Sequence, residues 1–249
     1  MTKQNWNAAK YGRDASFVSQ LGNPVLQLLA PQSGEKILDL GCGDGDLTLQ
    51  IQNCGCEILG IDSSADMIAA ASQKGLTTRV LDARDLNYSA EFNAVFTNAV
   101  LHWISDIDLV VNNVYRALKP EGRFVGEFGG AGNIQSIVDA LVETFREDDF
   151  GKFENPWYFP SVSDLRMVLE RSEFIVDYIE LIPRPTPLKS GVHSWLEIFT
   201  NGITHHLDSE RKKQLITKVA QKLKPHIYSS PEGWVADYVR IRFRAIKQA

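Results

Sequence analysis

Residues 37–45 read Ile-Leu-Asp-Leu-Gly-Cys-Gly-Asp-Gly, an apolar run that passes into three glycines at alternate positions. An apolar run bounded by glycine predicts a buried strand, and the pattern near Leu47–Gln52 predicts a helix after it. Glycines allow a tight turn and close approach of the backbone to a ligand. The start of the helix presents free N–H groups. This stretch therefore predicts a strand, a ligand-binding loop and a helix.

Strands and helices alternate beyond this loop. Short apolar runs predict four more strands, at Glu57–Ile61, Thr77–Leu81, Phe92–Thr97 and Gly122–Phe128. Helical patterns lie at Leu109–Leu118 and from Ser63 to Gln73, where Ser63-Ser-Ala-Asp66 predicts a capping box. Such alternation is typical of βαβ units and a parallel sheet.

The second half of the chain has a different pattern. Helices are predicted at Ile134–Phe145, Ser163–Arg171, Glu197–His206 and Glu210–Leu223. Phe174–Ile182 predicts a further strand. Alternating apolar and polar residues over Val235–Ile246 predict the last strand. We expect one α/β domain with helical insertions rather than two independent domains.

Composition excludes several classes of protein. The chain has 249 residues, 44% of them hydrophobic, and a formal net charge of −5, which argues against general nucleic-acid binding. No apolar run approaches the ~20 residues of a membrane span. Cys42, Cys54 and Cys56 form no metal or disulfide framework, and the pair His205-His206 lacks a third ligand. The cysteine usage favours a reducing cytoplasm, and we expect no metal site.

A second acid indicates which ligand the loop binds. Asp62 ends the predicted second strand, 21 residues after Gly41, where a carboxylate can accept the ribose hydroxyls of a nucleoside. The third glycine comes one residue too early for the dinucleotide fingerprint. Asp39, just before the glycines, suits a cationic amino group better than a pyrophosphate.

Residues 33–128 resemble the class I S-adenosylmethionine-dependent methyltransferases. The resemblance implies an α/β fold with a seven-stranded, mostly parallel Rossmann-like sheet, an antiparallel last strand and helical cap insertions. It also implies S-adenosylmethionine as the cofactor. We expect an N-terminal helical segment at 1–32 that covers the cofactor. The methyltransferase domain is expected at 33–249, with helical lids near 132–160 and 188–228.

The same resemblance implies the cofactor-binding residues. The glycine loop would hold the methionine part, Asp62 the ribose, and Asp82 the adenine amine. Tyr11 would close over the cofactor from the N-terminal helix. The full implied set is Tyr11, Asp39, Gly41, Cys42, Gly43, Asp62, Ser63, Met67, Asp82, Ala83, Asn98 and Ala99.

Three further motifs resemble the trans-aconitate methyltransferase-like group, which overlaps the malonyl-carrier-protein methyltransferases. These motifs are Trp6–Tyr11, Asn98–Trp103 and Asn155–Ser161. The resemblance implies a small-molecule acceptor, either a carboxylic acid or a carrier-linked acyl group, methylated on oxygen. Trp103, Trp157 and Tyr158 are then expected at the substrate. Packing of an insertion onto the sheet explains the aromatic loop equally well.

His102 is the candidate catalytic residue, either orienting a substrate carboxylate or acting as a base. A carboxylate is already ionised near neutral pH and needs no base, only alignment. An anionic acceptor also needs a cationic partner, for which the unranked candidates are Arg84, Arg123, Arg184 and His193. The basic helix face from Arg211 to Lys224 favours a solvated surface over a docking site for an acidic carrier.

Other functions remain open at this point. The acceptor could instead be an amine, a phenol or a lipid carbon. A nicotinamide-dependent oxidoreductase is a weaker alternative because of the glycine spacing. A cofactor-binding protein without transferase activity is the third.

Overall fold

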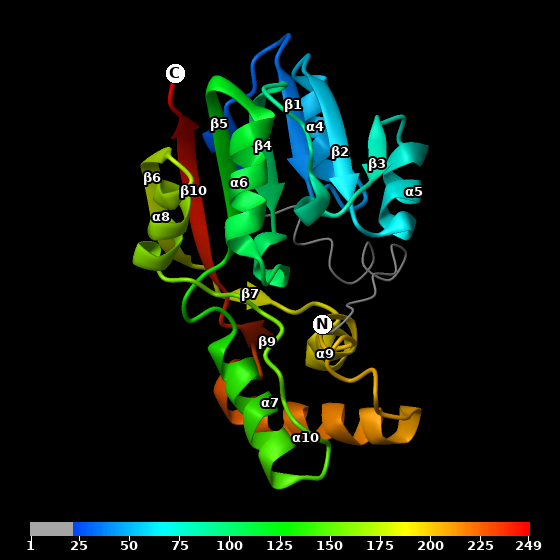
Figure 1. The fold of residues 1–249 in the computed structure, drawn as a ribbon. Coiled ribbons are helices and arrows are strands. Elements are labelled where there is room, and N and C mark those ends of the chain that lie inside the picture. The colour runs from blue at the N-terminus through cyan, green and yellow to red at the C-terminus, as the bar shows by residue number, and fades with distance from the viewer. Residues whose placement is uncertain (1–21) are drawn as a thin grey trace.

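A seven-stranded sheet forms the upper half of the molecule in this computed structural model, which describes residues 22–249 (Figure 1). The strand order is β3-β2-β1-β4-β5-β10-β6. β1 to β5 pair in parallel, and β10 runs antiparallel to both neighbours. The strands are β1 (Lys36–Leu40), β2 (Glu57–Asp62), β3 (Thr78–Val80), β4 (Phe92–Asn98), β5 (Leu118–Gly129), β6 (Phe174–Pro183) and β10 (Val239–Lys247). The expected mostly parallel sheet with an antiparallel last strand is confirmed.

Helices cover both faces of this sheet because successive side chains of each strand point to opposite faces. Ile37 of β1 packs with α3 (Asn23–Leu29) and α4 (Asp46–Asn53). The neighbouring Leu38 packs with α6 (Ile107–Ala117) and α8 (Val162–Arg171) on the other face. A further helix, α5 (Ala65–Gln73), contacts β2 and β3. The sheet is therefore buried on both sides, as parallel sheets require.

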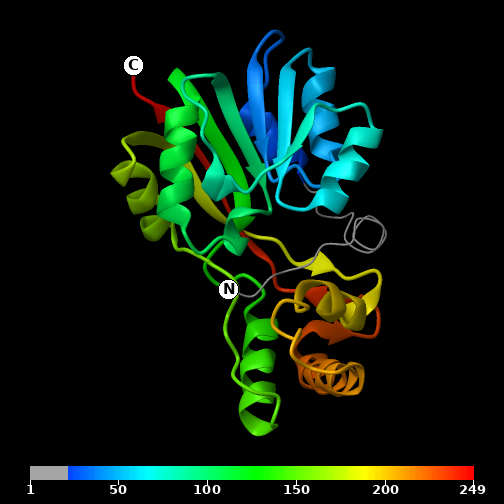
Figure 2. The ribbon, with the colours of Figure 1, turned by 45° about the vertical axis from the view of Figure 1, so that its right-hand side comes forward.

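A second lobe lies beyond the carboxyl ends of β1, β2 and β4 (Figures 1 and 2). It contains α7 (Gln135–Glu147), α9 (Gly191–Phe199) and α10 (Ser209–Ile227). A small sheet of β7 (Thr186–Pro187), β9 (Gly233–Ala236) and β8 (Tyr228–Ser229) joins them. The lobe has its own apolar core, which includes Leu141, Leu196 and Val219. The helical segments expected near 132–160 and 188–228 thus pack together.

Three local predictions were wrong. The expected helix at Glu197–His206 is α9 at Gly191–Phe199, and the residues after it form turns in which the Thr204 hydroxyl donates to the Thr200 carbonyl. The single strand expected at Val235–Ile246 is two strands, since β9 pairs in the small sheet and β10 in the large one. The helix cap is Ser64 rather than Ser63, because the Ser64 hydroxyl accepts from the Met67 N–H.

Candidate active site

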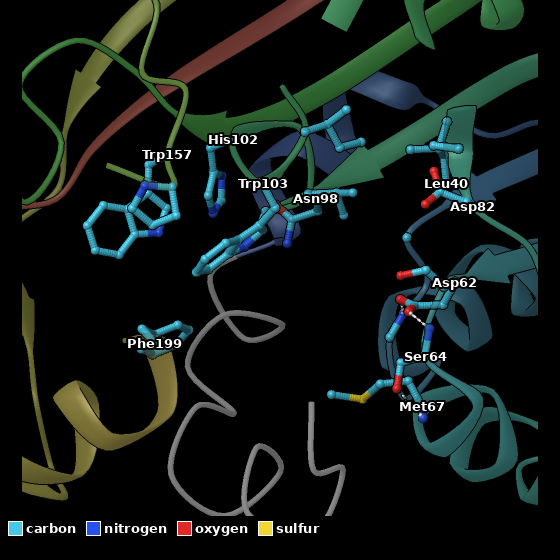
Figure 3. A pocket seen from close by; sticks show the side chains of 18 of the residues that line it. Leu40, Asp62, Ser64, Met67, Asp82, Asn98, His102, Trp103, Trp157 and Phe199 are labelled. Carbon is cyan, nitrogen blue, oxygen red and sulfur yellow. Dashed lines mark hydrogen bonds between the residues drawn. The ribbon is translucent and has the colours of Figure 1, made fainter. Parts of the chain in front are cut away.

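A cavity of about 1120 Å³ opens where the carboxyl ends of the parallel strands face the second lobe. Figure 3 shows its labelled side chains in two groups. Asp62, Ser64 and Asp82 form a polar side, and the aromatic rings of Trp157 and Phe199 lie on the other. The strand order reverses between β1 and β4, and open α/β sheets bind their ligands at such a switch point.

The glycine loop is held against the end of β2. The N–H groups of Gly41 and Cys42 both donate to the Ile61 carbonyl, at 2.8 and 2.9 Å. Gly41 has a φ of +77°, and a Cβ there would lie 2.2 Å from Val100 Cγ2. Only glycine fits this position beside Val100.

Asp62 fixes the loop as well as lining the cavity. Its Oδ2 accepts from the Gly43 N–H at 3.1 Å, and its Oδ1 accepts from the Ser64 N–H at 2.8 Å. Burial raises the pKa of the Asp62 carboxyl, and these two hydrogen bonds oppose the rise. The side chain is therefore oriented before any ligand arrives.

Asp82 lies next along the same edge. Arg84 binds it with two parallel bonds, Nε to Oδ1 at 2.9 Å and Nη2 to Oδ2 at 2.6 Å. The hydrogen bond from Arg84 lowers the pKa of the Asp82 carboxyl, which keeps it ionised. Of the other expected cofactor residues, those that line the cavity with Asp62 and Asp82 are Gly41, Gly43, Ser63, Met67, Ala83, Asn98 and Ala99.

The side chains of Asp39 and Cys42 do not line the cavity. The buried Asp39 Oδ2 accepts from the Thr48 hydroxyl at 2.6 Å. Burial raises the pKa of the Asp39 carboxyl to about 7. Cys42 is buried against Gly60, and burial also raises the pKa of its thiol. Tyr11, the remaining expected cofactor residue, lies outside the part of the chain that the structure describes.

The buried Asp39 makes stability depend on pH. Between its ordinary value of 3.8 and about 7, the folded state keeps a proton that the unfolded chain has lost. The unfolding free energy of the ligand-free protein should therefore fall as pH rises through this window. Asp39→Asn removes this pH-dependent loss of stability. The melting temperature of the variant minus that of wild type should therefore increase from about pH 5 to about pH 8. The exposed Asp108→Asn is the control, and a difference between Asp39→Asn and wild type that is constant with pH would contradict the expectation.

Aromatic side chains from four regions line the other end of the cavity. His102 and Trp103 follow β4, with ring centroids 5.3 Å apart. Trp157 belongs to the loop before α8, and its ring lies 6.0 Å from that of Trp103. Phe199 of α9 stacks on Trp103 at 6.4 Å. We call this the aromatic chamber; it is formed by His102, Trp103, Trp157, Phe159, Trp195, Phe199 and Tyr238, which all line the cavity.

Tyr158 has a different position from its two neighbours. It packs against the core between the sheet and α6 and α8, and it does not line the cavity. Its backbone N–H donates to the His102 carbonyl at 2.9 Å. Tyr158 therefore links the aromatic loop to the segment after β4 rather than facing the cavity.

His102 has one ring nitrogen already bonded. Nδ1 accepts from the Gly129 N–H at 3.3 Å. Burial, together with the charge of Arg240, holds the pKa of the His102 imidazole well below its ordinary value. A neutral imidazole whose Nδ1 accepts must carry its proton on Nε2. This arrangement makes His102 a hydrogen-bond donor toward a ligand rather than a base.

Arg240 is a cation at the cavity that was not among the partners predicted for an anionic acceptor. It is 7% exposed, lines the cavity and lies 4.5 Å from the centroid of the Tyr238 ring. The alternation of β10 assigned it to the polar face with Arg242 and Arg244. Nothing in the local sequence shows that the second lobe covers the beginning of this strand.

The four cations proposed from sequence lie elsewhere or already bind acids. Arg123 binds Glu35 at 2.6 Å at the end of the sheet opposite the cavity. Arg184 binds Glu127. Arg84 is held by Asp82, and His193 is exposed. None of them supplies a cation to the aromatic chamber.

The basic face of α10 is partly neutralised by α7. Lys218 forms an ion pair with Asp148, while Lys222 binds Glu143 at 3.3 Å and Glu147 at 2.7 Å. These pairs reduce the charge that the helix could offer to an acidic carrier protein.

Residues 22–249 contain neither a helix suited to a membrane nor a cluster of metal ligands. No helix there is long and apolar enough to cross a membrane. No group of three or more His, Cys, Asp or Glu side chains in this range could hold a metal ion. The expectation of a metal-independent reaction stays a prediction.

The chain is similar in sequence to several known proteins. Residues 38–126 match the family described as a methyltransferase domain. An uncharacterized methyltransferase of Schizosaccharomyces pombe is 35% identical over 262 aligned positions, covering 100% of both chains. A trans-aconitate 2-methyltransferase of Mycolicibacterium gilvum is 34% identical over 106 residues, 41% of this chain and 40% of that protein.

A solved structure agrees in fold. The YcgJ protein of Bacillus subtilis superposes with a TM-score of 0.65 at 20% identity, covering 92% of this chain and 98% of that one. At this identity the likeness concerns the fold alone. The full-length relative and the matched domain together define the family of this chain.

Proposed function

The chain belongs to the class I S-adenosylmethionine-dependent methyltransferases, and we propose that it methylates a carboxylate oxygen of a small organic acid. S-adenosylmethionine is its cofactor and, when bound, supplies an electrophilic methyl group on a cationic sulfur. The partial likeness to a trans-aconitate 2-methyltransferase supports a carboxylate acceptor.

The polar side of the cavity fits this cofactor. We assign the ribose hydroxyls to the oriented carboxylate of Asp62 and the exocyclic amine of adenine to Asp82, which would share its oxygens with Arg84. Gly41 and Gly43 line the cavity, and we assign the methionine part to their backbone. Asn98 lies between the two sides of the cavity, where the acceptor would meet the cofactor.

The buried guanidinium of Arg240 is the observation that carries the choice of acceptor. A buried cation among the aromatic rings that line the cavity favours an anionic ligand. A cationic amine brought close to this guanidinium would be repelled. The chamber therefore favours a carboxylate over an amine.

The protein's task in such a reaction is positioning. A carboxylate is ionised at neutral pH, so no proton has to be removed. Arg240 and the Nε2–H of His102 would hold one carboxylate and leave an oxygen directed at the methyl group. Aromatic side chains of the second lobe, Trp195 and Phe199, line the same cavity, and an apolar lining strengthens both interactions.

The kind of product tests this proposal. Purified protein is incubated with methyl-labelled S-adenosylmethionine and a panel of carboxylic acids, carrier-linked malonyl groups, amines and phenols. We expect label that base treatment releases as methanol, because methyl esters are hydrolysed by base while N-methyl groups and phenolic ethers are stable. Base-stable label confined to amines, phenols or carbon would overturn the carboxylate assignment.

A further inference from the structure

Resting on the proposed function, we propose that Asn133 is a further acceptor-binding residue, whose side-chain amide donates to a carboxylate oxygen of the acceptor beside His102. Asn133 lies in the turn between β5 and α7 and is not among the substrate residues predicted from the sequence. Three observations support this assignment: the orientation of the Asn133 amide, its place at the cavity, and its contact with the residue that also orients His102.

The Asn133 amide has one orientation. Its Oδ1 accepts from the backbone N–H of Val239, the first residue of β10, at 3.0 Å. Rotating the amide by half a turn would set its Nδ2 group against this N–H, donor against donor. The turn is itself held in place, since the Gly130 N–H donates to the Val239 carbonyl at 3.0 Å and the Asn133 N–H donates to the Gly130 carbonyl at 2.9 Å. The Nδ2 group therefore lies on the side of the amide away from Val239.

The Nδ2 group of Asn133 is accessible from the cavity. Asn133 is 2% exposed and lines the cavity. Within residues 22–249, no other group accepts a hydrogen bond from Nδ2, and the fully covered side-chain atom left without a partner is Asp237 Oδ1. Nδ2 is thus neither bonded nor completely covered. A buried N–H without an acceptor is unfavourable, so an oxygen of a ligand bound here would be stabilised by it.

Asn133 and His102 both contact Gly129, the last residue of β5. The Gly129 N–H donates to His102 Nδ1 at 3.3 Å, which leaves the imidazole proton on Nε2. A Cβ at Gly129 would lie 2.7 Å from Asn133 Nδ2 and 2.5 Å from Phe159 Cε1. Because glycine has no Cβ, these groups can pack closely around it. Two neutral N–H donors from different segments therefore border the same part of the cavity.

Two such donors favour a ligand that offers oxygen lone pairs. A carboxylate has about four lone-pair sites on its two oxygens, so it can accept from His102 and from Asn133 and still direct a lone pair at the methyl group. An ammonium group has donors only and finds no acceptor in this pair. The donors thus favour a carboxylate through neutral hydrogen bonds, independently of any cation at the cavity.

Asn133→Asp tests the donor while it preserves the bond to Val239. The new side chain has the same shape, and one carboxylate oxygen can still accept from the Val239 N–H. Its other oxygen replaces the donor and repels a carboxylate ligand. The probes are trans-aconitate, malonate and benzoate, and the acid that wild type esterifies fastest is used with every variant. We expect kcat/KM to fall roughly 10–100-fold, mainly through a higher KM, the usual effect of losing a hydrogen bond to a charged group.

Titration calorimetry of the same acid into the complex with S-adenosylhomocysteine should show a comparable loss of affinity without turnover. Asn133→Ala removes both the donor and the bond to Val239, and it should also weaken the binding of the acid. This second variant keeps the inference testable if Asn133→Asp does not fold. Melting curves and the affinity for S-adenosylhomocysteine verify that each variant is folded.

Asn93→Asp is the matched control. The Asn93 Oδ1 also accepts from a backbone N–H, that of Lys36, at 3.0 Å. Asn93 lies at the start of β4, away from the carboxyl ends of the strands, and does not line the cavity. Its substitution should leave KM and the affinity for the acid unchanged.

The outcomes separate this inference from the proposed function. If Asn133→Asp esterified and bound the acid as well as Asn93→Asp does, Asn133 would serve the turn alone, and the inference would be refuted while the carboxylate acceptor stood. If wild type methylated only amines, the proposed function would fail as well. Asn133→Asp should then bind the amine more tightly than wild type, because it adds a negative charge at the cavity.

Discussion

Glu127→Ala is expected to lower the unfolding free energy by about 3–5 kcal/mol, the usual effect of removing one partner from a buried ion pair. Glu127 is 2% exposed on β5. Its Oε1 lies 2.5 Å from Arg184, and its Oε2 lies 2.7 Å from Arg242. Without the carboxylate, two mostly buried guanidiniums would be left close together with no negative charge between them.

An exposed ion pair in the same part of the sheet is the control. Asp177 binds Arg244 at 2.8 Å, but both side chains are more than a third exposed. Asp177→Ala should cost at most about 1 kcal/mol because water screens such a pair. Chemical denaturation of both variants measures the difference. If Glu127→Ala lost no more stability than Asp177→Ala, the buried cluster would not contribute as expected.

The Glu127 cluster, formed by Glu127, Arg184 and Arg242, also lies next to the wall of the cavity. The Glu127 carbonyl accepts from the Ala99 N–H at 2.7 Å, immediately after β4. Asn98 and Ala99 line the cavity, so the cluster supports its wall. We therefore expect that part of any activity lost in Glu127→Ala reflects this support rather than contact with a ligand.

The cofactor half could be predicted because its determinants are local. Ile37 and Leu38 face opposite sides of the sheet, and the glycine loop follows within a few residues. Asp62 is the final residue of β2, as its position after an apolar run predicted. The polar residue at the end of each parallel strand lies at the same edge of the sheet. Predicting where each strand ends is therefore enough to predict that these residues lie close together.

The acceptor half could not be predicted in the same way. Its residues come from the segment after β4, the aromatic loop, α9 and the start of β10, which are far apart in sequence and meet through the packing of the second lobe. Arg240 sits in an alternating pattern in which the polar positions are usually solvated. Its burial depends on Tyr238 and Trp195, and no periodicity in the sequence reports that contact.

Asp62→Ala is expected to weaken cofactor binding by about 10–100-fold, since hydrogen bonds to a charged group contribute about 1.5–3 kcal/mol. Two effects add in this variant. The ribose loses its assigned acceptor, and the N–H groups of Gly43 and Ser64 lose theirs, which loosens the glycine loop. Asp62→Asn retains one acceptor oxygen and should have a smaller effect.

Calorimetry with S-adenosylhomocysteine distinguishes these contributions without requiring an acceptor. Glu57→Gln is the matched control, because Glu57 lies at the opposite end of β2 and is exposed. Its affinity for S-adenosylhomocysteine should equal that of wild type. Asp62→Ala should bind more weakly than Asp62→Asn, and Asp62→Asn more weakly than the control. An affinity of Asp62→Ala equal to that of Glu57→Gln would show that the carboxylate at the end of β2 does not hold the ribose.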